Sequence, residues 1–310
     1  MGAVLDVILP FFALIGCGFF AARRRLLPEG AIAGLNVYVW YFALPCMAFR
    51  ALALRPLSES FDGRFVAAWL AGGWALYVGV AALGRVLFRA PAGEALLLGQ
   101  GAQLGNVGYM GIPLMFSLHG ETGAALAVLA MLCDTLLIQV PTLALLEMTK
   151  SRGGDPLKVA ANVLKGFVRI PVVSGVALAV VVVAAGIRPP AAVTFFSDML
   201  GRTAGPVALF AIGASLAGRR IADGLPEVGL MVVCKLALAP LVVAAAMGLF
   251  LGGGERFVVG VLLAALPVGG NYYLVAQNSG FSGARASSAI LISTVVAVAS
   301  FSSVAAWMAG

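Results

Sequence analysis

Charged residues are scarce in this chain. They make up 11% of its 310 residues, whereas a soluble domain holds about 25%. Hydrophobic residues reach 62%, and the mean hydropathy is +1.04. This composition excludes a soluble globular domain and indicates an integral membrane protein. Strand-length alternation is also missing, and lipid leaves only helices and closed barrels as spanning structures. We therefore expect an all-α membrane protein.

Histidine and cysteine are few as well. The one histidine, His119, falls in an expected loop, and the HExxH pattern of zinc peptidases is missing. None of the four cysteines has CxxC spacing; they are Cys17, Cys46, Cys133 and Cys234. These absences argue against an enzyme, a disulfide framework, a metal site and any cofactor. The formal charge is +7, but no basic run alternates with aromatics, so we expect no nucleic-acid partner.

What the chain has in abundance is long apolar stretches, which predict ten transmembrane spans. We number them 1 to 10; they cover residues 4–22, 31–51, 65–88, 94–118, 122–148, 168–187, 191–216, 226–251, 255–279 and 284–308. Twelve loop lysines and arginines fall on one side of the membrane, and five fall on the other. The richer side is predicted to be cytoplasmic, so both termini are expected on the non-cytoplasmic side.

The two halves of the chain show an internal duplication. The polar stretch 149–166, a predicted cytoplasmic linker, separates five spans in 1–148 from five in 167–310. Matching residues recur at one offset of 161 positions, as Pro10 and Pro171, Pro28 and Pro189, Pro45 and Pro206, Glu94 and Glu255, and Gly99 and Gly260. Because each repeat has an odd number of spans, the second is expected to be inverted. Pro45 and Pro206 should kink spans 2 and 7 at equivalent places.

Two corresponding spans, 4 and 9, are interrupted by helix-breaking residues about a dozen positions after a glutamate. The first interruption reads GAQLGNVGYMGIPLM over 101–115, and the second reads LAALPVGGNYYLVAQ over 263–277. Paired interruptions of this kind point to a substrate site at mid-membrane in a secondary transporter. The alternative is that the glycines and prolines only permit close helix packing. The matching of two segments favours the site.

In span 4, glycines weaken the helix and Pro113 is expected to open a second half-helix. Asn106 then lies about 18 Å from Glu94, near the bilayer midplane. Span 9 breaks at Pro267 to Gly270, so the two segments can cross. Exposed amides and half-helix N-termini at the crossing suit a carboxylate. The candidate substrate-binding residues are Gly105, Asn106, Val107, Gly108, Met110, Pro267, Gly270, Asn271, Tyr272 and Gln277, with Gly111 and Pro113 as crossover hinges.

Two charged residues, Asp134 in span 5 and Lys235 in span 8, are expected deep in the membrane. A charge at such depth costs at least about 2.5–3.5 kcal/mol and is a functional candidate. Asp134 is interpreted either as a proton or sodium carrier or as a cap for unwound backbone. Lys235 is interpreted either as a counter-charge to Asp134 or to substrate, or as a structural group.

The motifs NVGYMGIPLM at 106–115 and ALPVGGNYYLVAQ at 265–277 resemble those of the auxin efflux carrier family, which includes plant PIN transporters and bacterial carriers of malonate and malate. The short central loop is similar to that of the bacterial members, which implies a bacterial inner membrane location. The resemblance implies a fold like that of bile-acid symporters and sodium–proton antiporters. It also implies a homodimer, and a scaffold domain (spans 1, 2, 6 and 7) that moves against a transport domain (spans 3–5 and 8–10).

By the same resemblance, Asn106 would contact the substrate carboxylate. Lys235 followed by Pro240 matches a family pattern and suggests an architectural role for the lysine. One departure concerns Gly270, Asn271 and Tyr272, where the plant motif tends to carry a second proline; this makes a smaller polar anion an alternative to auxin.

The function expected from the sequence is therefore alternating-access transport of a small organic anion. Candidate substrates are malonate, malate or an auxin-like acid. One alternative is a proton- or sodium-coupled exchanger on the same fold. Adjacent intramembrane acids would support it, and Asp134 is the one such acid. The other alternative is an ion channel, which would need a continuous polar path.

Overall fold

Helices fill the part of the chain that can be described. The computed structural model describes residues 2–56, 61–149, 158, 161, 165–166, 170–218, 224–279 and 283–309. Within these ranges there is no strand, and the one isolated bridge joins Gly105 to Val268. The all-α expectation is confirmed for the described residues. The linker 149–166 falls largely outside them.

The first half of the chain runs from α1 to α8. Its elements are α1 (Gly2–Arg23), α2 (Ala31–Tyr38), the π-helix η1 (Val39–Ala43), α3 (Leu44–Ala53), α5 (Gly63–Phe88), α6 (Ala92–Gln103), the π-helix η2 (Val107–Gly111), α7 (Ile112–Cys133), the π-helix η3 (Asp134–Gln139) and α8 (Val140–Met148).

The second half runs from α10 to α17. Its elements are α10 (Pro171–Ala184), α11 (Ala191–Gly201), α12 (Ala204–Leu216), α13 (Leu225–Val233), the π-helix η4 (Cys234–Leu238), α14 (Ala239–Leu251), α15 (Glu255–Ala264), α16 (Asn271–Asn278) and α17 (Gly283–Ala309).

Six helical stretches in the described residues are long and apolar enough to cross a membrane. They are Ala31–Ala53, Gly63–Phe88, Val107–Met148, Ala191–Leu216, Leu225–Leu251 and Gly283–Met308. Shorter apolar helices cover Leu9–Arg23 and Pro171–Ala184. The stretch Val107–Met148 bends at Gly120, whose φ of 59° and ψ of −147° are not helical. Spans 4 and 9 are not among the six as whole spans, since each is divided into shorter helices. The count of ten stays a prediction.

The four π-helices share one cause. Each ends just before a helix that carries proline at its first or second position: Pro45 after η1, Pro113 after η2, Pro141 after η3 and Pro240 after η4. Proline lacks an N–H and its ring clashes with the carbonyl of the preceding turn, so a wider turn accommodates it. The wide turns place Asn106, Asp134 and Lys235 at or next to irregular backbone.

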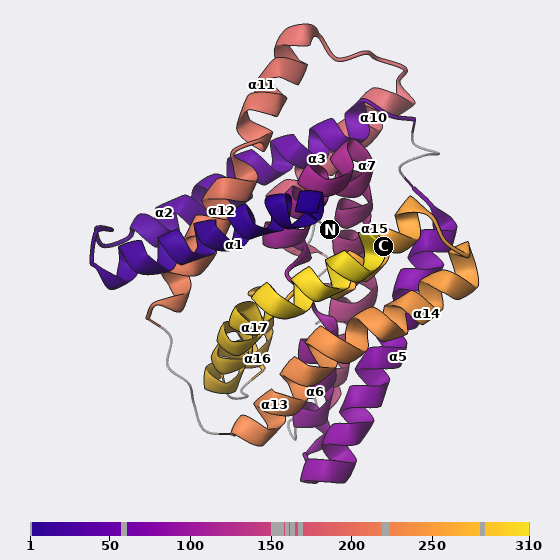
Figure 1. The fold of residues 1–310 in the computed structure, drawn as a ribbon. Coiled ribbons are helices and arrows are strands. Elements are labelled where there is room, and N and C mark those ends of the chain that lie inside the picture. The colour runs from indigo at the N-terminus through magenta and orange to yellow at the C-terminus, as the bar shows by residue number, and fades with distance from the viewer. Residues whose placement is uncertain are drawn as a thin grey trace.

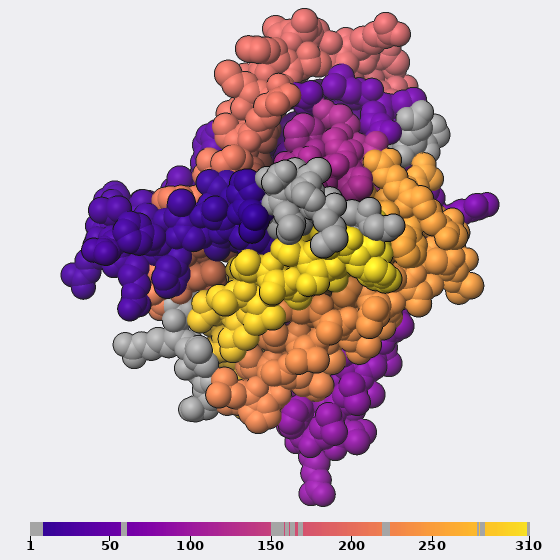
Figure 2. All heavy atoms as spheres, in the orientation of Figure 1, coloured from indigo at the N-terminus to yellow at the C-terminus, as the bar shows by residue number. Residues whose placement is uncertain are grey.

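Helix packing falls into two groups (Figure 1). In one group α1 packs on α12, and α3 packs on α10 and α11. In the other, α5 packs on α6 and α14, and α14 packs on α15. The space-filling view shows α17 lying along α13 and reaching toward α1 of the first group (Figure 2). Helix α7 packs on η2 and on α15 of the second group. The two groups also meet where α7 contacts α3 and where η2 contacts α12.

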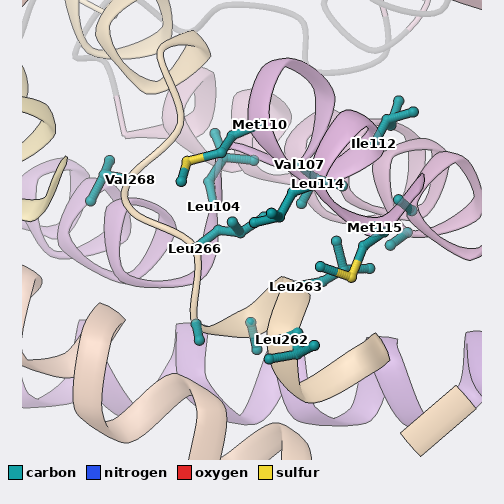
Figure 3. Packing of buried hydrophobic residues seen from close by; sticks show 14 of the residues in the cluster. Leu104, Val107, Met110, Ile112, Leu114, Met115, Leu262, Leu263, Leu266 and Val268 are labelled. Carbon is teal, nitrogen blue, oxygen red and sulfur yellow. The ribbon is translucent and has the colours of Figure 1, made fainter. Parts of the chain in front are cut away.

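Apolar side chains from the two interrupted segments fill the space beside their crossing (Figure 3). They converge on Gly111, where an added Cβ would lie 2.9 Å from Leu266, 3.0 Å from Leu263 and 3.3 Å from Val107. A side chain at position 111 would therefore push the two segments apart. Pro113 packs closely against α12, because a Cβ at Gly205 of that helix would lie 3.0 Å from its ring.

Candidate functional site

The two interrupted segments meet through their backbones. After α6 ends, Leu104 accepts a hydrogen bond from the Gly269 N–H at 3.0 Å, and the Asn106 N–H donates to Pro267 O at 2.9 Å. The bridge between Gly105 and Val268 lies between these bonds and is antiparallel. Unwound backbone at membrane depth must find such partners. The approach is close: an added Cβ at Gly269 would lie 2.8 Å from Gly105 O.

New helices begin on both sides of this crossing. Asn106 precedes η2, and its carbonyl accepts from the N–H groups of Met110 at 3.1 Å and Gly111 at 3.0 Å. The Asn106 side chain makes no capping hydrogen bond, which leaves its amide available to a ligand. On the other segment α16 begins at Asn271, also without a side-chain cap. The N–H groups of both helix starts add positive potential to this region.

A cavity of about 340 Å³ lies at the crossing. Its walls come from both interrupted segments, from η3, and from α2, η1 and α12. The lining residues are Asn36, Trp40, Leu104, Gly105, Asn106, Val107, Gly108, Tyr109, Met131, Asp134, Thr135, Gln139, Ala211, Ile212, Ser215, Gly269, Gly270, Asn271, Tyr273 and Leu274. Among the described residues, the lining contains several amides and hydroxyls, one carboxylate and no lysine or arginine.

Seven of the expected site residues line this cavity: Gly105, Asn106, Val107, Gly108, Asp134, Gly270 and Asn271. Five others do not. Met110 is fully buried in the apolar core, and Pro267 contributes its carbonyl to the crossing. Tyr272 lines a separate cavity of about 40 Å³ beside Glu94, Glu227 and Arg285. Gln277 is exposed near the end of α16, and Lys235 is not among the lining residues.

Of the expected hinges, Gly111 ends η2 and Pro113 lies in the first turn of α7. Pro45 follows η1, and Pro206 lies in the first turn of α12, after the break at Arg202 and Thr203 between α11 and α12. All four positions therefore lie where helix geometry changes.

Asp134 is a buried carboxylate that is only half satisfied. Its side chain is 3% exposed, and Oδ1 accepts hydrogen bonds from Trp69 Nε1 and Gln103 Nε2, both at 2.8 Å. Oδ2 has no hydrogen-bond partner among the described residues, although Asp134 lines the cavity. A buried carboxylate with a free oxygen is poised to take a proton or a cation.

Lys235 lies behind the crossing and is 1% exposed. Its Nζ donates to Gln103 O at 3.0 Å, the carbonyl that ends α6. A Cβ at Gly105 would lie 3.2 Å from the same ammonium. Gln103 therefore links the two charges, since its side chain bonds Asp134 and its carbonyl bonds Lys235. The positive charge stabilises the negative end of α6 at the break.

Several residues in and beside the cavity were not expected from sequence. Asn36 and Gln139 carried a usable signal, because an amide inside an apolar stretch needs a partner. Trp40 and Tyr109, which stack with ring centroids 5.3 Å apart, gave none, since aromatic residues are ordinary in membrane helices. Trp69 and Gln103, the donors to Asp134, come from other helices that no local pattern connects to it.

Irregular backbone from two distant segments, paired beside a cavity that amides and hydroxyls help to line, is in an all-α membrane protein the arrangement of a secondary transporter. Comparison with known families agrees. The model of the family described as membrane transport protein matches residues 3–304, and the chain belongs to this family, the auxin efflux carriers. It is an integral membrane transporter and not an enzyme.

Two relatives illustrate the range of the similarity. A Rhizobium meliloti (strain 1021) protein named "Putative malonate transporter" is 30% identical over 302 residues, which cover 96% of this chain and 94% of the relative. An Escherichia coli (strain K12) protein named "Uncharacterized transporter YfdV" is 24% identical over 243 residues, covering 76% of this chain and 75% of the relative.

Proposed function

We propose that this protein moves a small organic anion, with malonate or malate as the leading candidates, through the membrane by alternating access. The observation that carries the proposal is the cavity of about 340 Å³ at the crossing, to which both interrupted segments contribute an asparagine, Asn106 and Asn271. The name of the Rhizobium meliloti relative supports a dicarboxylate. An auxin-like acid is the aromatic alternative.

The anion would be held without a basic side chain. The side-chain amides of Asn106 and Asn271, the N–H groups that begin η2 and the backbone N–H of Asn271 supply the donors. A hydrogen bond to a charged group contributes about 1.5–3 kcal/mol, so the loss of one donor should weaken anion binding about tenfold to a hundredfold. Asn106 is the principal contact in this proposal because it is half-buried, whereas Asn271 is exposed.

The negative charge of Asp134 makes ion coupling part of the proposal. At an effective dielectric constant of about 20, two like charges about 6 Å apart repel each other by about 3 kcal/mol. A substrate anion in the cavity would meet such repulsion from an ionised Asp134. A proton or sodium ion on the free Oδ2 removes it, so anion and cation enter together. Lys235 is the neighbouring positive charge that acts on Asp134.

The wider architecture in this proposal has ten spans in two inverted repeats. The scaffold comprises spans 1, 2, 6 and 7, and the transport domain comprises spans 3–5 and 8–10. The contacts of α1 with α12, and of α3 with α10 and α11, support this division. Both termini would lie on the non-cytoplasmic side of a bacterial inner membrane, and two copies would associate through their scaffolds.

The two ends of the molecule differ in a way that supports alternating access. A second cavity of about 240 Å³ shares lining residues with the first and extends to Gly166 and Ile170, at the end of the linker. Toward the opposite end, Arg50 of α3 bonds Glu121 of α7 at 2.8 Å and also pairs with Asp198 of α11. Arg50 thus joins the proposed scaffold to the proposed transport domain at that end.

A thermal-shift screen followed by uptake assays tests the proposal. The purified protein is screened against monocarboxylates, dicarboxylates and indole acids, with and without sodium and across pH. Stabilising acids are then measured as labelled substrates in proteoliposomes. We expect a short dicarboxylate to stabilise the protein and to be taken up saturably. Failure of every acid both to stabilise and to be transported would refute the proposal.

The second candidate is a proton- or sodium-coupled exchanger that carries no organic substrate, and the free Oδ2 of Asp134 favours it. Such a protein would exchange cations across proteoliposomes in the absence of any organic acid. The organic-anion carrier would show cation movement only when its substrate is present. The same vesicles therefore distinguish the two candidates.

A further inference from the structure

Trp40 lies flat on the wall of the substrate cavity. It comes from η1 of the proposed scaffold and stacks on Tyr109 of η2, with an interplanar angle of 7° and ring centroids 5.3 Å apart. It also covers Gly108, where an added Cβ would lie 3.8 Å from Trp40 Cζ3. The indole therefore shields one face of the Tyr109 ring, three residues along the chain from Asn106.

The same indole borders two cavities. It lines the cavity at the crossing and also the second cavity of about 240 Å³, which reaches Gly166, Ile170 and Val173. Both cavities also share Met131, Thr135, Gln139 and Asn271. Trp40 thus stands where a solute would pass from the second cavity to the asparagines of the first. Its ring is half-buried, while the next residue, Tyr41, is 59% exposed.

We propose that Trp40 determines the specificity of the site for aliphatic over aromatic carboxylates, by occupying the face of Tyr109 against which an aromatic substrate would stack. This inference rests on the proposed function. Aromatic rings gain from offset stacking, and the Trp40 indole already satisfies Tyr109 in that way. An aliphatic acid needs only the amides and N–H groups, which the indole leaves open. An aromatic acid must either displace the indole or forgo the stacking.

The test compares two ligands on a set of variants. Displacement of labelled malonate by unlabelled malonate and by indole-3-acetate is measured for the unmodified protein, Trp40→Ala, Trp40→Phe and Tyr41→Ala. We expect Trp40→Ala to bind indole-3-acetate about fivefold to tenfold more tightly, the gain of one ring stack. Malonate affinity should change by less than about threefold. Trp40→Phe should stay near the unmodified protein, because a smaller ring still covers Tyr109.

Tyr41→Ala is the matched control, since it removes an adjacent ring that does not line either cavity. It should leave both affinities unchanged. The double variant Trp40→Ala with Tyr109→Ala tests whether the gain in affinity depends on the Tyr109 ring. It should lose the gain for indole-3-acetate, because no ring remains for the substrate to stack on.

Three results would overturn the inference. Weaker binding of indole-3-acetate by Trp40→Ala would mean that Trp40 itself stacks on substrates. An equal change in the affinities for malonate and indole-3-acetate would mean that Trp40→Ala alters the cavity generally and not its specificity. If the double variant keeps the gain in affinity for indole-3-acetate, the gain comes from the larger cavity and not from stacking on Tyr109. If Trp40→Ala does not fold, Trp40→Leu replaces it, with the same expected gain. Failure of the unmodified protein to bind any carboxylate would instead refute the proposed function.

Discussion

The two interrupted segments occupy corresponding places in the chain, but they are built differently. The first continues from Asn106 into a π-helix and then into the long helix α7. The second continues from Gly270 into α16, which has eight residues. Asn106 lies seven residues before its proline, Pro113, whereas Asn271 lies four residues after Pro267. The asparagines therefore reach the cavity from opposite ends of their breaks.

The groups that satisfy the broken backbone differ as well. At the first break, the charged Lys235 Nζ bonds Gln103 O at 3.0 Å. At the second, the Val268 N–H donates to the neutral Ser293 Oγ at 3.1 Å. In the part of the chain that the structure describes, one break thus carries a buried charge connected through Gln103 to Asp134, and the other carries none. The comparison teaches that two breaks at corresponding places in a chain can be stabilised differently, one by a charged side chain and the other by a neutral hydroxyl.

The largest effect should come from removing the charge at the first break. Lys235→Met keeps the length of the side chain but leaves Gln103 O without its donor and Asp134 without a nearby cation. We expect a loss of about 3 kcal/mol in the free energy of unfolding. Ser293→Ala at the second break should cost about 1 kcal/mol. Melting temperatures of the purified proteins in detergent measure both. Similar losses in the free energy of unfolding for the two variants would contradict the proposed difference between the two breaks.

The next effect concerns the two asparagines. Asn106→Ala should reduce uptake of the transported anion about a hundredfold, effectively abolishing it, while the protein still folds, because a hydrogen bond to a charged group contributes up to about 3 kcal/mol. Asn271→Ala should reduce it only about fivefold, since that residue is exposed. Initial uptake rates in proteoliposomes measure the effects of both variants, and melting temperatures are the control for folding. Normal uptake by folded Asn106→Ala would contradict the assignment.

The location of the crossing could be predicted from sequence because proline and glycine act on the backbone locally, and the breaks recur at one offset. The directions in which side chains point after a break could not be predicted from sequence. Tyr272 was expected in the site but points to a separate cavity with Arg285, because the first turn of α16 follows irregular backbone whose path no periodicity reveals. Trp40, Trp69 and Gln103 were missed for a related reason, since tertiary packing alone brings them to Tyr109 and Asp134.

A third comparison isolates the charge of Asp134 from its hydrogen bonds. Asp134→Asn keeps an oxygen that can accept from Trp69 and Gln103 but removes the negative charge. If a proton enters with the anion, uptake by the unmodified protein rises as pH falls, because the proton is a co-substrate. We expect the variant to lose this dependence, and any dependence on sodium, while keeping anion binding. Glu29→Gln, an exposed loop substitution, is the control. An unchanged response to pH and sodium would assign Asp134 a structural role.

The smallest expected effect separates two arginines at the end opposite the second cavity. Arg50 pairs with Glu121 and Asp198, and so joins α3 to both α7 and α11. Arg202, the residue after the end of α11, pairs with Asp198 at 2.7 Å, four residues earlier in the chain, and is 63% exposed. Loss of a partly exposed ion pair costs about 1 kcal/mol or less, so Arg50→Gln should change the rate of substrate exchange by up to about fivefold. Arg202→Gln should leave that rate unchanged, because its pair does not cross between the two helix groups. Counterflow of labelled substrate measures both variants, and equal effects would show that Arg50 does not couple the two groups.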